Sequence, residues 1–144
     1  DNFYKGGLQN GISAKDREMR SAFTWPNPLK PVLFWHVRGN EEMSASGTSF
    51  LNRTEAEKIN NILNEMIEGG ISMSHIAIIT PYKGQRGYLS QYLLKTGNLK
   101  QPLYKELEIA SIDSFQGREK DYIIISTVRS SEGQGIGFLK DERR

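Results

Sequence analysis

Four short runs of apolar residues recur along the chain with little polar alternation. They cover residues 32–37, 76–80, 107–112 and 122–127. A strand buried on both faces has such a continuous apolar run, whereas a half-exposed strand alternates apolar and polar positions. Pro81 directly follows the second run and ends it, because proline lacks the N–H that a central ladder requires. The pattern therefore predicts four strands of a parallel sheet.

Apolar residues at helical spacing occupy two of the segments between these runs. The first helix is expected to begin at Asn52, with Glu55 three positions later in a capping-box pattern, and to stop at Gly69. The second is expected to turn Tyr88 and Tyr92 into the core. Parallel strands need crossovers that cover both faces of their sheet. The alternation therefore predicts the α/β class, with helices on both faces.

The segments outside these elements contain residues that break periodic structure. Residues 1–31 carry several glycines and three prolines, and we expect a loop-rich leading segment of the same domain that residues 32–144 form. A linker is expected around Pro102. The aromatic residues Trp35 and His36 are expected to serve in packing.

Composition limits the class of protein. A chain of 144 residues with ordinary apolar content is long enough for one hydrophobic core. No apolar run approaches the roughly 18 residues that cross a bilayer, so no membrane contact is expected. Cysteine is absent and there are two histidines, which leaves no ligand set for a structural metal. The lack of cysteine fits a reducing compartment, and we expect a cytoplasmic protein.

Known catalytic signatures are missing. The sequence contains no G-x-x-x-x-G-K-[ST] loop to cradle nucleotide phosphates, and no G-x-S-x-G or H-E-x-x-H motif. The net charge of +2 comes from intermixed acids and bases, so charge alone does not indicate a polyanion partner. Any catalytic role must therefore be shared with another domain.

Residues 109–129 read I-A-S-I-D-S-F-Q-G-R-E-K-D-Y-I-I-I-S-T-V-R, and they resemble motif V of superfamily-1B helicases. Further blocks are similar to the up-frameshift-type RNA helicases in the same order. These blocks are F-Y-K-G-G-L-Q-N-G at 3–11, S-G-T-S-F-L-N-R-T-E-A at 46–56, I-I-T-P-Y-K-G-Q-R-G-Y-L-S-Q-Y at 78–92, and G-Q-G-I-G-F-L-K-D-E-R-R at 133–144. The resemblance thus covers essentially the whole chain.

The resemblance implies a partial second RecA-like motor domain, cut before its final strand and before motif VI with its arginine finger. It also implies an ATP-dependent 5′-to-3′ helicase that moves along single-stranded RNA in nonsense-mediated mRNA decay, with other decay proteins as partners. ATP and Mg²⁺ would be held mostly by a first motor domain that is missing here. Because both the phosphate loop and the finger are missing, we expect this fragment alone to be inactive as an ATPase.

By the same resemblance, one wall of the nucleotide site is expected in the turn after the third apolar run. Glu119 would accept a hydrogen bond from the ribose, and Gly117 would let the backbone approach the phosphates. Gln116 and Arg118 would face the cleft between the two motor domains. Without the resemblance, these residues would be interpreted as a turn glycine and solvated polar side chains.

The RNA grip is expected where two apolar runs end. Thr80, Pro81 and Tyr82 offer a hydroxyl, a fixed φ and an aromatic ring, which suit a backbone phosphate and a base. Ser111 and Asp113 match motif V positions that face nucleic acid, and Arg129 could add a phosphate contact. The alternative interpretation is an ordinary strand-ending turn.

Two other functions remain open from the residues themselves. A related superfamily-1B DNA helicase would use the same side chains, since sugar discrimination needs a contact to the 2′-hydroxyl that no motif here reveals. A non-enzymatic α/β module that binds RNA or protein is favoured for the isolated chain by the missing phosphate loop. The sequence of the complete protein would separate these alternatives.

Overall fold

The computed structural model describes residues 7, 9, 11, 13, 23–27 and 29–130. The chain divides into two compact units, Asp1–Phe34 and Trp35–Arg144. Most of the expected leading segment and the whole terminal block 133–144 lie outside the described residues. All helices and strands reported below belong to the second unit.

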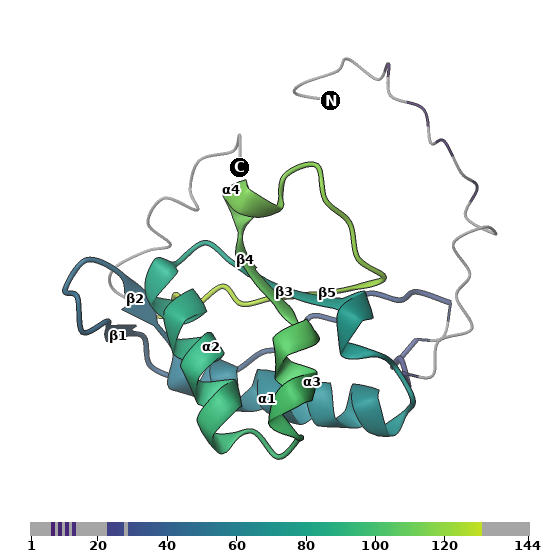
Figure 1. Cartoon of the computed structure of the whole chain (residues 1–144). Helices are drawn as coiled ribbons and strands as arrows, with labels where there is room; N and C mark the ends of the chain where they lie inside the picture. Colours follow the sequence, from purple (N-terminus) through teal and green to yellow (C-terminus); the bar gives the residue numbers. More distant parts are fainter. Residues whose placement is uncertain are drawn as a thin grey trace. The chain divides into compact units, whose positions relative to one another are not determined.

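A three-stranded parallel sheet forms the centre of the second unit (Figure 1). Strand β3 (Ile76–Thr80) lies in the middle and pairs with β4 (Glu108–Ser111) on one side and β5 (Tyr122–Ile125) on the other. These strands fall within three of the four apolar runs. The expected α/β class with a parallel sheet is therefore confirmed.

Three longer helices lie along one side of this sheet (Figure 1). They are α1 (Arg53–Glu68), α2 (Lys83–Thr96) and α3 (Gln101–Glu106). The smaller elements are the antiparallel pair β1 (Glu42–Met43) and β2 (Phe50–Leu51), the 3-10 turn η2 (Met73–His75) and the single-turn helix α4 (Ile112–Phe115). Figure 1 shows α4 at the far end of β4, away from the long helices.

The two faces of the sheet are covered to different extents by the described residues. Side chains alternate between faces along a strand. On one face, Ala77 packs with Ala110 and Phe115 in a small apolar cluster. Register places Ile123 and Ile125 of β5 on this same face, where they are 41% and 63% exposed. Ile76 and Ile78 point to the other face and are completely buried, so the main core lies on the helical side.

The strand expected at residues 32–37 is not formed, and that prediction was wrong. The segment joins no ladder among the described residues, and Val32 and Phe34 are 83% and 85% exposed. Apolar, β-favouring residues make a strand only where a neighbouring strand accepts their backbone hydrogen bonds. Trp35 and His36 are also exposed instead of packed, and the Lys58 ammonium lies 3.4 Å from the centroid of the Trp35 ring.

Two expectations about helices are also corrected. The linker expected around Pro102 is helix α3, because proline is well tolerated in the first turn, where the missing N–H has no helical partner. Tyr88 and Tyr92 are only half-buried, and their rings stack on each other at 5.5 Å between centroids. The Arg53 guanidinium covers the Tyr88 ring at 4.9 Å, so this pair lies at the surface of the core.

Candidate functional site

The carboxyl ends of the three parallel strands meet at one edge of the sheet. Thr80, the last residue of β3, is in register with Ser111, the last residue of β4. On the other side, the N–H of Ser126, just beyond β5, donates to the carbonyl of Ile79 at 2.9 Å. Segments 80–82, 111–113 and 126–130 therefore leave the sheet side by side. In open parallel sheets, this edge is where ligands bind.

Thr80, Pro81 and Tyr82 form the exit of β3. Thr80 is fully buried, and its hydroxyl oxygen accepts from the N–H of Tyr82 at 3.4 Å. The Tyr82 ring is also buried and meets the ring of Phe50 edge-on, with centroids 6.0 Å apart. The Tyr82 ring therefore packs inside the protein next to Phe50, while Pro81 remains half-exposed. The RNA contacts expected of these residues stay predictions.

Ser111 and Asp113 lie at the start of α4. The Ser111 hydroxyl accepts from the N–H of Ser114 at 3.2 Å, and the Ser111 N–H donates to the Ser114 hydroxyl at 3.0 Å. This reciprocal capping box explains why the chain turns into a helix directly after β4. The hydroxyl of Ser111 is therefore engaged in the cap, whereas Asp113 is exposed in the first turn. Asp113 is thus the accessible acid at this strand end.

The loop after α4 carries the residues expected at the nucleotide. Gly117 has φ of 76°, a left-handed conformation that favours glycine, so its position in the turn has a clear backbone reason. The Arg118 guanidinium lies 2.6 Å from the Glu108 carboxylate at the start of β4. Gln116 and Glu119 are exposed. The loop is therefore held by Arg118 and presents Gln116 and Glu119 to solvent.

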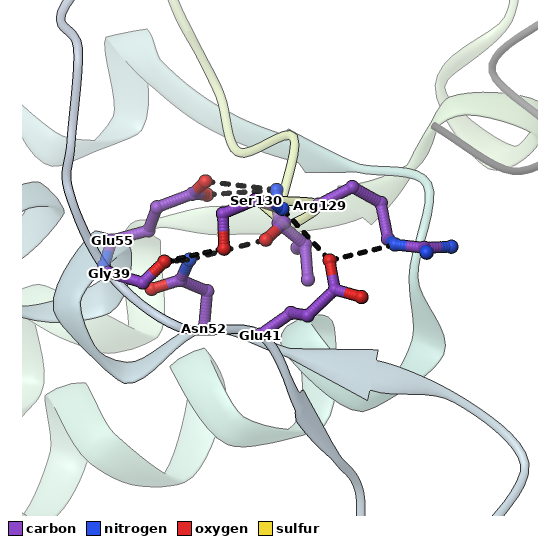
Figure 2. A network of polar contacts seen from close by, with 7 residues as sticks. Gly39, Glu41, Asn52, Glu55, Arg129 and Ser130 are labelled. Carbon is purple, nitrogen blue, oxygen red and sulfur yellow. Dashed lines mark hydrogen bonds and ion pairs between the residues drawn. The ribbon is translucent and has the colours of Figure 1, made fainter. Parts of the chain in front are cut away.

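Arg129 follows β5 and is held within the protein. Its Nε donates to Glu41 at 2.9 Å, and both side chains are more than nine-tenths buried (Figure 2). The guanidinium carbon lies 4.6 Å from the centroid of the Phe50 ring. The hydrogen bond with Glu41, and to a smaller extent one with Tyr82, raises the pKa of Arg129 above its usual value, while burial opposes the shift. Its expected contact with an RNA phosphate stays a prediction.

The buried side-chain amide of Gln85, which the sequence pattern did not reveal, links helix α2 to the start of α1 and to the segment after β5. Gln85 on α2 is fully buried, and its Oε1 accepts from the N–H of Asn52 at 2.8 Å. Its Nε2 donates to the Asn52 carbonyl at 3.1 Å and to the Ser126 hydroxyl at 3.0 Å. The pattern of α2 gives no signal for this role, because a glutamine in a first turn is usually solvated.

The expected capping box of α1 is only half correct. The Asn52 side chain accepts from the N–H of Glu55 at 3.0 Å, as an N-cap should. The Glu55 carboxylate does not return to the Asn52 N–H, because Gln85 already accepts from it. Glu55 instead binds residues beyond β5. Sequence spacing identified the pair of residues but not the partner of the acid.

Within residues 29–130 and the few described before them, no group of three metal-ligating side chains comes together. No helix in that described part is both long and apolar enough to span a bilayer.

A model of the AAA domain family matches residues 1–144. The chain belongs to the AAA domain family. The chain is also similar to the regulator of nonsense transcripts 1 homolog of Drosophila melanogaster, with 56% identity over 142 residues. It is also 51% identical to the ATP-dependent helicase upf1 of Schizosaccharomyces pombe and 50% identical to the ATP-dependent helicase NAM7 of Saccharomyces cerevisiae, over 143 residues each.

The resemblance read from the motifs is thereby confirmed. Each of these alignments covers 99% of this chain. It covers only 12% of the Drosophila melanogaster relative, 16% of the Schizosaccharomyces pombe relative and 15% of the Saccharomyces cerevisiae relative. The chain therefore spans about an eighth to a sixth of the length of these relatives.

Proposed function

We propose that this chain is the second motor-domain segment of an ATP-dependent 5′-to-3′ RNA helicase that acts in nonsense-mediated mRNA decay. One observation carries the proposal: three strand exits converge at one sheet edge in a chain that is half identical to named ATP-dependent helicases. Such an edge can contribute one wall of a cleft. A first motor domain would contribute the other wall.

The proposed division of labour follows from the position of each segment at the strand ends. Exposed Glu119 and Gln116, on the turn made by Gly117, would line the ATP cleft, with the ribose hydroxyls as the hydrogen-bonding partners of Glu119. The exits at Thr80–Tyr82 and Ser111–Asp113 would hold the backbone of single-stranded RNA. When ATP draws the two motor domains together, grips on different domains would alternate and move the protein along the strand.

Magnesium would accompany the ATP, but the described part of this chain offers no side-chain cluster that fits the ion. No cluster of metal-ligating side chains occurs among the described residues. We therefore assign Mg²⁺ and the phosphate loop to the first motor domain, and we derive no step from the ion. Other decay factors as partners belong to the same proposal, supported by the relative named as a regulator of nonsense transcripts. A cytoplasmic location is proposed with them, from the absence of cysteine in the sequence.

The nucleotide part of the proposal is tested with Glu119→Gln in the complete protein. This change removes a charged acceptor from an exposed side chain, so the fold should persist while the KM for ATP rises several-fold. Glu106→Gln, an equally exposed change on α3, is the matched control and should leave KM unaltered. An unchanged KM in the Glu119 variant would contradict the assignment.

The RNA part is tested with Thr80→Val, which keeps the buried shape and removes the hydroxyl that accepts from the N–H of Tyr82, so that the exit of β3 is less firmly held. We expect weaker binding of polyuridine in a fluorescence titration. Thr96→Val, at the exposed end of α2, is the control and should bind as the wild type does. Competition between polyuridine and poly-deoxythymidine, with the unmodified complete protein, distinguishes RNA from DNA. Preference for the DNA strand would favour the related DNA helicase.

A further inference from the structure

Val128 adopts a backbone conformation that is unusual for its side chain. Its φ is 69°, in the left-handed region, and the residue is completely buried. A β-branched residue rarely occupies this region, because Cβ crowds the backbone. The N–H of Arg129 donates to the carbonyl of Thr127 at 2.8 Å, which closes a three-residue turn around Val128. Such a strained turn persists only where its surroundings hold it.

The start of α1 provides that hold. Both carboxylate oxygens of Glu55 accept from the N–H of Val128, at 3.0 and 3.1 Å. The carbonyl of Val128 accepts from the Asn52 side-chain amide at 3.2 Å. Ser126 adds a third hydrogen bond to the same carboxylate, since its hydroxyl donates to Glu55 Oε2 at 2.5 Å. The peptide groups on both sides of Val128 are thus fixed from one helix end.

Beyond the turn, Arg129 and Ser130 form hydrogen bonds with residues 39–41. One Glu41 carboxylate oxygen accepts from Arg129 Nε at 2.9 Å and from the Ser130 N–H at 2.8 Å. The Ser130 hydroxyl donates to the carbonyl of Gly39. A Cβ on Gly39 would lie 2.5 Å from the Cβ of Thr54, so this close approach to α1 requires glycine. Figure 2 shows the Glu41 carboxylate directed at Arg129 and Ser130.

The turn determines where the Arg129 side chain lies. From Val128 the chain places the Arg129 guanidinium over the Phe50 ring, and Phe50 in turn meets the edge of Tyr82. A continuous series of contacts therefore runs from α1 to the exit of β3. We propose that Glu55 is a positioning residue of the motor, which holds the turn at Val128 so that Arg129 supports Tyr82 beside Thr80.

Glu55 does not accept the N-cap hydrogen bond that a capping box would give it, which strengthens this inference. A glutamate at the third helical position usually accepts from the N-cap N–H, yet here Gln85 takes that N–H. The carboxylate is consequently available for three hydrogen bonds from Ser126 and Val128. A glutamine at position 55 would point its NH₂ group at one of these donors. The turn at Val128 would then lose at least one of the hydrogen bonds that fix it.

The experiment compares variants of the complete protein in RNA-stimulated ATP hydrolysis, and this readout rests on the proposed function. We expect Glu55→Gln to lower kcat roughly tenfold and to raise the KM for RNA, because a displaced support misplaces the RNA-contacting exit. The KM for ATP should change little. Glu57→Gln, an exposed acid on the same helix, is the matched control and should behave as the wild type.

A second variant separates support of the turn from general loss of stability. Glycine adopts the left-handed φ without strain but also removes a buried side chain, so the Glu55→Gln/Val128→Gly double variant is compared with Val128→Gly alone. Its kcat should lie within about twofold of that of the single Val128→Gly variant. Amide hydrogen exchange in segment 126–130, measured without ATP or RNA, should rise when Glu55→Gln is introduced into the wild type and change little when it is introduced into Val128→Gly.

Failure of the inference is distinguishable from failure of the proposed function. If the wild type hydrolyses ATP in response to RNA, a Glu55→Gln variant equal to Glu57→Gln overturns the inference. So does a double variant whose kcat falls as far below that of Val128→Gly as the kcat of Glu55→Gln falls below that of the wild type. If the wild type shows no such hydrolysis, the proposed function is contradicted instead. In that case, unchanged hydrogen exchange at 126–130 in Glu55→Gln still overturns the support of Val128 by Glu55.

Discussion

Arg118 Nη1 lies 2.6 Å from Glu108 Oε1, which ties the loop after α4 back to the first residue of β4. The Arg118 guanidinium also lies 5.7 Å from the centroid of the Phe115 ring, which packs on Ala110 of the sheet. The ion pair thus fixes the turn at Gly117 and, with it, the backbone on which Glu119 stands. Arg118 was expected at the nucleotide, and its observed partner is a strand residue of the same domain.

Removing this ion pair should loosen the loop more than it destabilises the fold. We expect Glu108→Gln to raise amide hydrogen exchange at residues 116–121. Because the Arg118 side chain is 54% exposed, water screens the pair, and its coupling with Arg118→Gln in urea unfolding should be only about 0.2–1 kcal/mol. Glu106→Gln on α3 is the control. Unchanged exchange in the Glu108 variant would show that the pair does not hold the loop.

Gly117 and Gly87 should respond to alanine in opposite directions. A Cβ at either position meets no atom within 4 Å, so packing does not decide the result. At Gly117 the φ of 76° strains any other residue, and Gly117→Ala should lower the free energy of unfolding by roughly 1–2 kcal/mol. Gly87 lies inside α2, where alanine should add roughly 0.5–1 kcal/mol. Urea titration measures both, and equal signs would refute the backbone explanation.

Gln85 should be sensitive to loss of its amide, because it joins α2 to the segment after β5. Gln85→Met keeps the length of the side chain but leaves the buried Asn52 N–H without its acceptor. We expect the free energy of unfolding to fall by at least roughly 1–3 kcal/mol, the cost of an unsatisfied buried group. Gln91→Met, exposed on the same helix, should change it by less than about 0.5 kcal/mol. Similar values for both variants would contradict this role.

The exposed isoleucines of β5 should make the isolated chain associate. Ile123 and Ile125 lie on the sheet face that the described residues cover least, and β5 is an outer strand of the sheet that these residues form. Apolar surface at a sheet edge promotes association, so Ile123→Thr/Ile125→Thr should shift sedimentation toward the monomer. Leu94→Thr, exposed on α2, is the control and should not shift it. A wild-type chain that is monomeric at high concentration would refute the prediction.

Continuous apolar runs were sufficient to locate three strands, because a parallel strand buried between neighbours needs apolar residues at every position. Residues 76–80 form β3 over the expected length. The run at 122–127 becomes a strand only to Ile125, since Ser126 and Thr127 already lead into the turn at Val128. The equally apolar run at 32–37 forms no strand. Local composition does not reveal whether a neighbouring strand is in place.

For the candidate site, the sequence predicted the positions of the segments but not the contacts of their side chains. Motif spacing located the strand exits and the turn at Gly117, because glycine and proline have strong local backbone preferences. It could not find the partners of Glu55, Arg118 or Arg129. Those partners lie between 10 and 88 positions away in the chain, and only the packing of α1, β4 and β5 brings them within hydrogen-bonding distance.

The sequence by itself therefore determined the α/β class, the two long helices α1 and α2 and the location of three strands, because these depend on local periodicity and on backbone preferences. The tertiary structure decided which polar groups meet at the ends of these strands. A carboxylate such as that of Glu55 binds whichever donors the fold leaves unpaired nearby. Here the folded chain gives it the N–H of a strained valine, 73 positions further along.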